Sequence, residues 1–313
     1  MKLSKYKELL NSVFKSKLSI FSFGIFSTFV LIAIVATGYQ IYCSHNAITP
    51  IYDIADFANR YQPPSWAHPF GTDYLGRDVF IRALFGSATA IKIGFIASII
   101  SGSIGVVLGM IAGYYKGIAD SIIVWIYSTF ASIPSLLFIL AFAILITKGY
   151  LYAPLLDILK AICAVSGTEL GMMAVYLGIG FTGWVTICRI VRAEVLKVKE
   201  MQFVQAAKVL GFSNIRILLK HILPNIFHLV IIYSTMRFAY AIMTEVIVSF
   251  LGVGVQLSPS WGIMIADGQQ RLWRGVWWEV AGATLFMFLL VLSLHLLGDI
   301  LRDILDPRLK ETE

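Results

Sequence analysis

Apolar runs long enough to cross a lipid bilayer recur along the whole of this sequence. A spanning α-helix needs about 17–25 predominantly apolar residues, and hydropathy predicts spans near 18–42, 88–113, 121–147, 170–191, 226–251 and 277–298. The chain is 58% hydrophobic and 14% charged, whereas soluble domains average about 45–50% apolar and about 25% charged. The predicted fold class is therefore an all-α integral membrane protein with six transmembrane helices.

The first apolar run, from Leu18 to Tyr42, follows a basic tail that resembles the n-region of a signal peptide. The run is longer than the usual h-region of about 7–15 apolar residues, and no small-x-small cleavage motif follows it closely. We therefore interpret it as a retained first span.

The positions of Lys and Arg predict the orientation of the spans, because basic loops stay on the cytoplasmic side. With the N-terminus inside, 16 of the 25 basic residues fall in cytoplasmic segments and seven fall outside, while Lys92 and Arg237 lie within spans. An even number of spans then puts both termini in the cytoplasm. The net charge of +7 is a topology signal on this interpretation, and it does not indicate nucleic-acid binding.

Residues 148–169 are apolar enough to suggest a seventh crossing, but Pro154, Asp157 and Lys160 interrupt them. A seventh span would also export either the basic 189–220 segment or the basic tail, against the charge rule. We predict an interfacial segment at the outer face, with an extra span as the alternative.

Small residues recur four apart in the second predicted span, which is typical of helices that pack closely against one another. A phosphate-binding glycine loop is the alternative, but no strand precedes this region and it lies inside a membrane run. The positions are Gly94, Ser98 and Gly102, followed by Gly105, Gly109 and Gly113.

The longest cytoplasmic stretch, residues 189–225, is predicted to form a helix, a turn and a second helix. Gly211 can take the left-handed conformation that ends a helix, and Ser213 or Asn214 can cap the next one. Pro224 is expected to end that second helix before the fifth span begins.

Three short motifs at fixed spacing in this stretch resemble those of a known family: Gln205-Ala206-Ala207, then Gly211, then Ile222-Leu223-Pro224. The pattern resembles the cytoplasmic "EAA" loop of ABC importer permeases, in which Glu-Ala-Ala, Gly and Ile-x-Leu-Pro recur at similar spacing. In that family the loop forms the coupling helix, which docks on the ATP-hydrolysing subunit, so the resemblance implies an ATPase-coupling role for these positions. Gln205 replaces the family's Glu and removes a charge that could pair with an Arg of the ATPase. A basic interfacial helix pair without a docking role is the alternative.

A second motif narrows the resemblance to one subunit. Residues 68–87 contain GTDYLGRD, similar to the GTD-x-x-GRD motif that follows the outer loop in one of the two permeases of dipeptide, oligopeptide and nickel importers; residues 249–268 and 298–310 also match that subunit. Physically, the charged members are expected to form an ion-pair and turn cluster, because the alternating-ligand spacing of a calcium loop is missing. The motif residues are Gly71, Thr72, Asp73, Gly76, Arg77 and Asp78.

Glu245 is the one acid placed well inside a predicted span. An intramembrane charge is expensive enough to suggest a function, so Glu245 is a candidate pore-lining residue that would meet the amino terminus of a peptide. The alternative is a structural pairing with a polar group of a neighbouring helix or with Arg237.

Several motifs of other protein classes are missing from the sequence. There is no G-x-x-x-x-G-K-[ST] phosphate loop, so nucleotide hydrolysis by that route belongs to another subunit. Inverted repeats typical of secondary transporters and the H-E-x-x-H or nucleophile-elbow motifs of membrane enzymes are also missing. Cys43, Cys163 and Cys188 show no metal-site spacing.

The resemblance implies a type I ABC importer permease fold with three segments. Residues 1–87 form the N-terminal tail, first helix and outer loop, residues 88–298 form a five-helix core that includes the coupling loop 192–225, and residues 299–313 form a cytoplasmic tail. The implied function is a non-enzymatic pore subunit in the bacterial inner membrane that imports di- or oligopeptides, with nickel or another small solute as the alternative. The implied partners are a homologous second permease, two subunits that bind ATP and Mg²⁺, an extracytoplasmic substrate-binding protein and membrane lipid.

Overall fold

The computed structural model describes residues 17–305, so the tail lysines from Lys2 to Lys15 and the basic residues Arg308 and Lys310 lie outside the described part. Long helices dominate that part, and its only extended pairing is an isolated bridge between Thr72 and Asp78. The long helices are α2 (Lys17–His45), α3 (Val79–Tyr115), α7 (Leu170–Val198), α10 (Leu223–Phe250) and α12 (Trp278–Leu305). The shorter ones are α4 (Gly117–Ser132), α5 (Ser135–Thr147), α6 (Ala153–Ser166), α8 (Gln202–Val209), α9 (Asn214–Ile217) and α11 (Trp261–Gln269), with a π-helical turn η3 at Leu218–Ile222.

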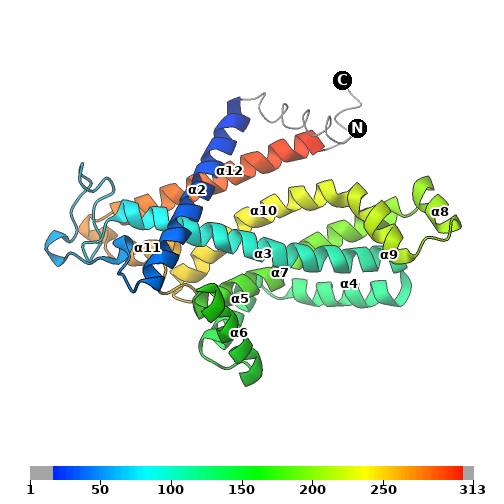
Figure 1. Cartoon of the computed structure of the whole chain (residues 1–313), viewed down its shortest axis with the longest axis horizontal. Helices are drawn as coiled ribbons and strands as arrows, with labels where there is room; N and C mark the ends of the chain where they lie inside the picture. The colour runs from blue at the N-terminus through cyan, green and yellow to red at the C-terminus, as the bar shows by residue number, and fades with distance from the viewer. Residues whose placement is uncertain (1–16, 306–313) are drawn as a thin grey trace.

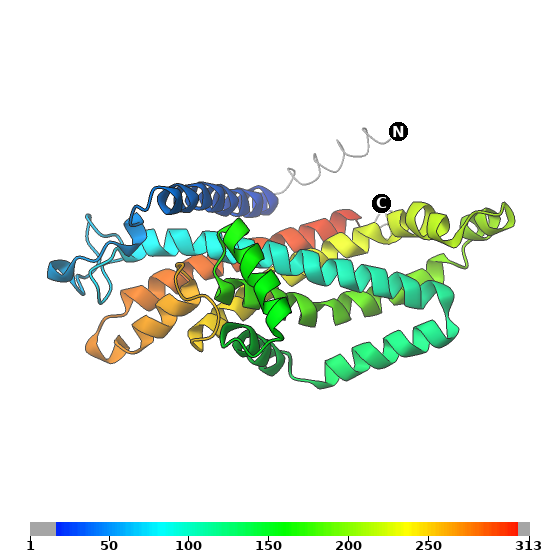
Figure 2. The same ribbon diagram turned by 60° about the horizontal axis from the view of Figure 1, so that its bottom comes forward.

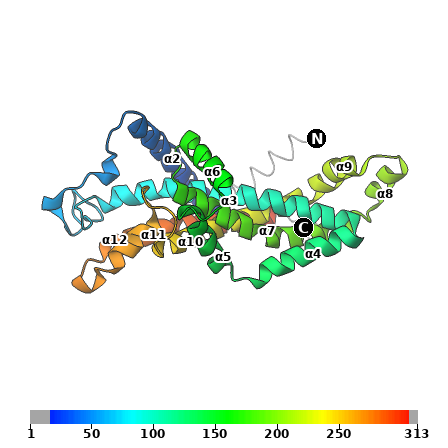
Figure 3. The same ribbon diagram turned by 90° about the horizontal axis from the view of Figure 1, so that it is seen from below.

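Five helical segments among the described residues are long and apolar enough to cross a membrane, in agreement with five of the predicted spans. The remaining predicted span, 121–147, is not one straight helix. It is divided into α4 and α5, which are bent by 88° and count as a sixth crossing if the pair is one broken span. Pro134 accounts for the break, because the residue before a proline is pushed out of the helical region, and Ile133 is extended with φ −88° and ψ 128°. Figures 2 and 3 show α4 diverging from α3 toward this break.

The apolar segment 148–169 contains the 14-residue helix α6. That length is below the roughly 17 residues that a span needs, so α6 by itself does not make a seventh crossing. Its inner side packs through Leu159 against Ala143 of α5 and Ala174 of α7.

The centre of the molecule is the pair α3 and α7, which lie side by side over much of their length (Figure 1). The glycine stripe of α3 faces α7 in register. A Cβ added at Gly109 would lie 2.8 Å from Cβ of Val191, and one at Gly113 would lie 2.7 Å from Cβ of Val195. Both values are well below the roughly 3.5–4.0 Å of ordinary carbon contacts, so only glycine permits this helix separation. Gly105 meets Ile187 in the same way, with 2.8 Å to its Cβ.

The two functional candidates lie at opposite ends of the long axis. Helices α8 and α9 form one end, and the outer loop that contains the GTDYLGRD motif forms the other, close to α11 and the start of α12 (Figure 1). The charge rule would put the first end in the cytoplasm and the second outside.

Candidate functional site

The coupling segment folds as a short helix, a glycine turn and a capped second helix. Helix α8 ends at Val209, and Gly211 follows with φ +75°, a conformation that residues with a Cβ rarely adopt. The N–H of Phe212 donates to the carbonyl of Ala207 at 3.1 Å, which closes the turn. Ser213 then caps α9 by accepting a hydrogen bond from the N–H of Arg216 at 3.4 Å. The local structure thus follows the sequence prediction for this turn.

Helix α8 has one face in the core and the other face uncovered. Val204 and Ala207 are buried against Ile217 and Ile222 in a cluster that also contains the last turns of α7. The opposite face carries Ala206, Phe203, Val209 and Leu210, and the last two are 89% and 72% exposed. An uncovered apolar face on a polar end of the molecule is typical of a surface that binds another protein.

The half-buried side chain of Gln205 is not part of that uncovered face and is directed back toward the end of α7. Its Nε2 donates to the carbonyl of Lys199 at 2.8 Å, and Lys199 in turn donates from Nζ to the carbonyl of Gly113 at 2.5 Å. Burial lowers the pKa of the Lys199 ammonium below its usual value, and the nearby Lys116 adds to this. These two hydrogen bonds link α8 through Lys199 to the end of the glycine stripe on α3, a contact that no sequence pattern predicts.

Pro224 does not end a helix, contrary to the sequence prediction. The helical run Asn214–Phe250 is continuous, and Leu223 and Pro224 form the first turn of α10. The π-turn makes this possible, because the N–H of Leu223 reaches back to the carbonyl of Leu218 and the wider turn accommodates the missing proline donor. Asn225 donates from its side chain to the carbonyl of His221 at 2.6 Å and supplies a partner there.

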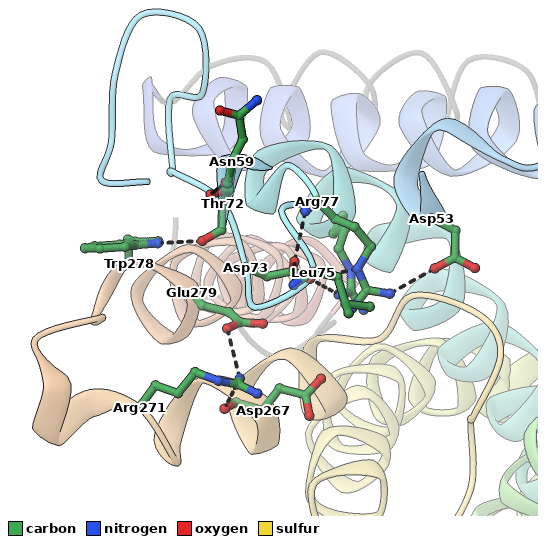
Figure 4. Close-up of polar contacts among 11 residues, drawn as sticks. Asp53, Asn59, Thr72, Asp73, Leu75, Arg77, Asp267, Arg271, Trp278 and Glu279 are labelled. Carbon is green, nitrogen blue, oxygen red and sulfur yellow. Dashed lines mark hydrogen bonds and ion pairs between the residues drawn. The ribbon is translucent and has the colours of Figure 1, made fainter. Parts of the chain in front are cut away.

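The outer motif is built around a fully buried aspartate. Asp73 Oδ2 accepts from Nε of Arg77 at 2.8 Å and from Nη1 of Arg82 at 2.5 Å, while its Oδ1 accepts from the N–H groups of Leu75 and Arg77. Arg77 also reaches Asp53 at 2.9 Å (Figure 4). The structure contains the predicted Asp73–Arg77 pair, but Asp78 pairs with His68 instead. Arg82 and Asp53 join the cluster and were not among its predicted members.

The other motif residues shape the loop around this aspartate. Gly71 and Gly76 have φ +65° and +77°, and a Cβ at Gly76 would collide with the backbone of Asp56. Thr72 accepts from Nε1 of Trp278 through its carbonyl at 3.0 Å, which joins the loop to α12 (Figure 4). Asp78 caps α3 by accepting from the N–H of Ile81 at 2.9 Å, and His68 lies 2.8 Å from its other oxygen.

A second ion pair, between Glu279 and Arg271, lies near the outer loop and was not predicted from the sequence. Glu279, at the start of α12, is buried, and its closest cation is Arg271 at 3.7 Å (Figure 4). Arg271 also donates to the carbonyl of Asp267 at 2.6 Å, and burial raises the pKa of the Asp267 carboxyl above its usual value. These partners come from α11, the following loop and α12, so no spacing along the chain reveals them.

Glu245 is 1% exposed, and its carboxylate accepts hydrogen bonds from two hydroxyl groups. Its Oε1 accepts from Ser249 at 2.8 Å and from Ser260 at 2.6 Å. Ser260 is also the N-cap of α11, so Glu245 holds the start of α11 against α10. Of the partners considered from sequence, the polar group of a neighbouring element is present, and Arg237 is directed elsewhere, toward the carbonyl of Ile179 at 3.0 Å.

Within residues 17–305, no group of three or more His, Cys, Asp and Glu side chains is arranged to hold a metal ion. Asp73 is satisfied by two arginines and two backbone N–H groups instead, whereas both carboxylate oxygens of Glu279 are buried without a hydrogen-bond partner among these residues.

Comparison with known proteins agrees with this architecture. Over 249 residues, 79% of this chain and 71% of the relative, the sequence is 37% identical to the dipeptide transport system permease protein DppC of Bacillus subtilis (strain 168). Over 98% of this chain and 91% of the relative it is 34% identical to the DppC protein of Alkalihalophilus pseudofirmus. The oligopeptide transport system permease protein OppC of Bacillus subtilis is 32% identical over 99% of this chain and 92% of that protein.

A solved structure shares the fold. A chain of the MetNI methionine ABC transporter in an inward-facing conformation superposes with a TM-score of 0.50 and 17% identity, covering 72% of this chain and 96% of that chain. Residues 105–311, two thirds of the sequence, match the family described as binding-protein-dependent transport system inner membrane component. The chain belongs to this family, and it is a membrane permease of the ABC importer type and not an enzyme.

Proposed function

We propose that this permease forms half of the pore of an ATP-driven importer of di- or oligopeptides. A homologous second permease completes the pore, two further subunits bind ATP and Mg²⁺, and an extracytoplasmic protein delivers the substrate. The peptide substrate is supported by the relatives, which are named for dipeptide and oligopeptide transport. Both termini and helix α8 face the cytoplasm in this proposal, following the distribution of basic residues.

The observation that carries the coupling role is the uncovered face of α8. Three apolar or small side chains of this eight-residue helix, and Leu210 directly after it, stay in solvent, although nearby residues of the same helix are buried. The buried residues hold α8 to the end of α7 and to the start of the helical run Asn214–Phe250, so a force applied to the uncovered face passes into two long helices. An ATPase subunit that moves on nucleotide binding would thereby shift the membrane helices between inward-open and outward-open states, which is the two-state element that coupling needs.

The packing and outer-loop residues have supporting roles in this proposal. Gly105, Gly109 and Gly113 keep α3 and α7 close together, so that the two helices move as one body. The Asp73 network fixes the outer loop, and the outer end then offers a firm surface to the delivering protein. Exposed apolar residues along α2, such as Leu31, Ile34 and Val35, contact lipid.

The test is transport by the whole complex, purified with its second permease and ATPases and reconstituted in vesicles with the substrate-binding protein. Labelled dipeptide should accumulate only with hydrolysable ATP, and radioactive nickel serves as the alternative substrate. Accumulation of nickel without peptide would replace the substrate and keep the importer, whereas ATP-independent uptake of either would refute the ATP-driven mechanism.

The coupling role is tested by two pairs of variants. Gly211→Val is expected to abolish uptake because Val is a steric outlier at φ +75°, whereas Gly211→Asn is expected to retain it because Asn tolerates this region. Ala206→Asp places an unpaired charge in the docking face, and Ala206→Ser is its control. Co-purification of the ATPases shows whether docking or only transmission fails. Wild-type uptake by both Gly211→Val and Ala206→Asp would refute the coupling assignment.

A further inference from the structure

A cavity of about 520 Å³, lined by both polar and apolar side chains, opens beside the middle of α10. Its walls come from α5, α7, α10 and α12, and its size falls within the roughly 300–1,000 Å³ of small-molecule sites. Polar side chains at membrane depth usually line a path for solutes or water and rarely face lipid. The polar lining residues are Ser135, Thr182, Thr186, Tyr233, Tyr240 and His295, together with Arg237.

Arg237 is the charged residue of this cavity. It lies near the midpoint of α10 (Leu223–Phe250), about 20 Å from either end of the helix. Its Nη2 donates to the carbonyl of Ile179 at 3.0 Å, and its guanidinium lies 4.8 Å from the centre of the Tyr240 ring. The site is shaped around this side chain, because a Cβ at Gly183 of α7 would overlap the guanidinium group.

The guanidinium has no anionic partner within the part of the chain that the structure describes. No carboxylate lies within 4.0 Å of it, and its Nε is buried without a hydrogen-bond partner. Glu245, two turns further along α10, is bonded to Ser249 and Ser260 and is not available. An arginine has five N–H donors, and a single one is paired here. An intramembrane cation normally pairs with a protein group, so the partner of this one is expected to come from outside the chain.

We infer that Arg237 binds a carboxylate of the peptide as it passes through the pore. The planar guanidinium fork matches a carboxylate in a two-point hydrogen-bonded pair, and the tyrosine and threonine hydroxyls beside it offer further hydrogen-bonding groups. The inference rests on the proposed function and names the chemical group recognised inside the membrane. It also reverses the sequence-based expectation that Glu245 would meet the amino terminus, because Glu245 is buried and the charge that lines the cavity is that of Arg237.

Two sources can supply the carboxylate, the C-terminus and an acidic side chain. The experiment therefore uses four labelled peptides of one length: a neutral sequence with a free C-terminus, the same sequence amidated, and Glu-containing and Gln-containing forms of the amide. Uptake by the complete reconstituted transporter is measured for wild type, Arg237→Gln and Arg237→Lys. Any preference of the substrate-binding protein is the same for all variants. It therefore cancels when the carboxylate-to-amide uptake ratio of a variant is divided by that of the wild type.

The expected result is a selective loss. In Arg237→Gln the carboxylate-to-amide ratio falls about tenfold or more, the magnitude of a charged hydrogen-bonded contact, and Arg237→Lys retains part of the preference. The control is Lys92→Gln, which removes the other intramembrane cation, a residue of α3 bonded to Gln40 at 3.2 Å and not part of the cavity. It should change uptake of all four peptides by the same factor.

Equal loss of all four peptides in Arg237→Gln, or no loss, overturns the inference while wild-type peptide uptake still supports the proposed function. Absence of peptide uptake by the wild type refutes the proposed function itself. If Arg237→Gln does not assemble, the variant Met236→Cys, at a position also in the cavity lining, is labelled with a neutral thiol reagent in a background without other cysteines. Protection by the free-acid peptide alone supports the inference, and equal protection by acid and amide overturns it.

Discussion

Replacing Asp73 by asparagine should destabilise the permease far more than the same replacement at Asp53. Asp73 is fully buried and accepts from both Arg77 and Arg82, whereas Asp53 is 49% exposed and contacts Arg77 alone. Asparagine at position 73 keeps one acceptor for the two backbone N–H groups but turns an N–H₂ donor toward two guanidinium groups. Among the described residues, Arg82 is then left without a carboxylate partner, and Arg77 keeps only the half-exposed Asp53.

The magnitude follows from burial. Breaking a buried ion pair from one side costs about 3–5 kcal/mol, whereas an exposed pair contributes about 0–1 kcal/mol. At roughly 2–4 °C of melting temperature per kcal/mol, Asp73→Asn lowers the melting temperature of the purified complex by about 6–20 °C, and Asp53→Asn by less than about 4 °C.

The assay is thermal unfolding of the purified complex, followed by loss of the monodisperse peak in size-exclusion chromatography after heating. A double variant, Asp73→Asn with Arg82→Gln, removes the unpaired charge of Arg82 and should recover part of the loss, because neighbouring groups in one network are not additive. Equal shifts for Asp73→Asn and Asp53→Asn, or no recovery in the double variant, would refute the argument that burial of Asp73 decides its contribution.

Three further outcomes are expected from the same complex. Gly109→Ala overpacks the contact with α7, costs about 1–3 kcal/mol and lowers the melting temperature. Gly38→Ala does not, because nothing lies within 4 Å of its added Cβ. Equal effects would mean that α3 and α7 can move apart to accommodate the methyl group. Gln205→Glu restores the family's residue but loses the donor to the Lys199 carbonyl, at about 0.5–1.5 kcal/mol, so ATPase-stimulated uptake should fall; a gain in uptake would show that a charge is preferred there. Glu245→Ala leaves two hydroxyls without their acceptor and lowers both stability and uptake, while Glu245→Gln retains most of both; identical behaviour would exclude this hydrogen-bonding role.

The sequence predicts the long helices of this fold well because hydropathy is a local property of the chain. The break between α4 and α5 is also encoded locally, in Ile133 and Pro134, but an average over a window of apolar residues does not detect a single proline. The turn at Gly211 was predictable for the same local reason. The continuity through Pro224 was not, because it depends on a π-turn whose hydrogen bonds form only in the folded helix.

The side-chain networks were predictable only in part. Asp73 and Arg77 are four residues apart and were expected to pair, whereas Asp53 and Glu279 come from distant parts of the chain. Glu245 could be singled out from hydropathy, but its bond to Ser260 depends on how α11 folds back onto α10. Among residues 17–305, the absence of an anion beside Arg237 is a property of the whole arrangement, so no pattern along the sequence could reveal it.

The uninterrupted helical run from Asn214 to Phe250 has a mechanical consequence. The run contains 37 residues and is about 55 Å long, and in the proposed mechanism it acts as a lever with α8 attached to the end at Asn214. Arg237 lies about 35 Å from that end, so a tilt of about 10° moves it by about 6 Å, twice the roughly 3 Å length of a hydrogen bond. A small rotation imposed at α8 is therefore enough to bring the guanidinium to a carboxylate or to withdraw it, and the stroke that opens the pore can also release the cargo.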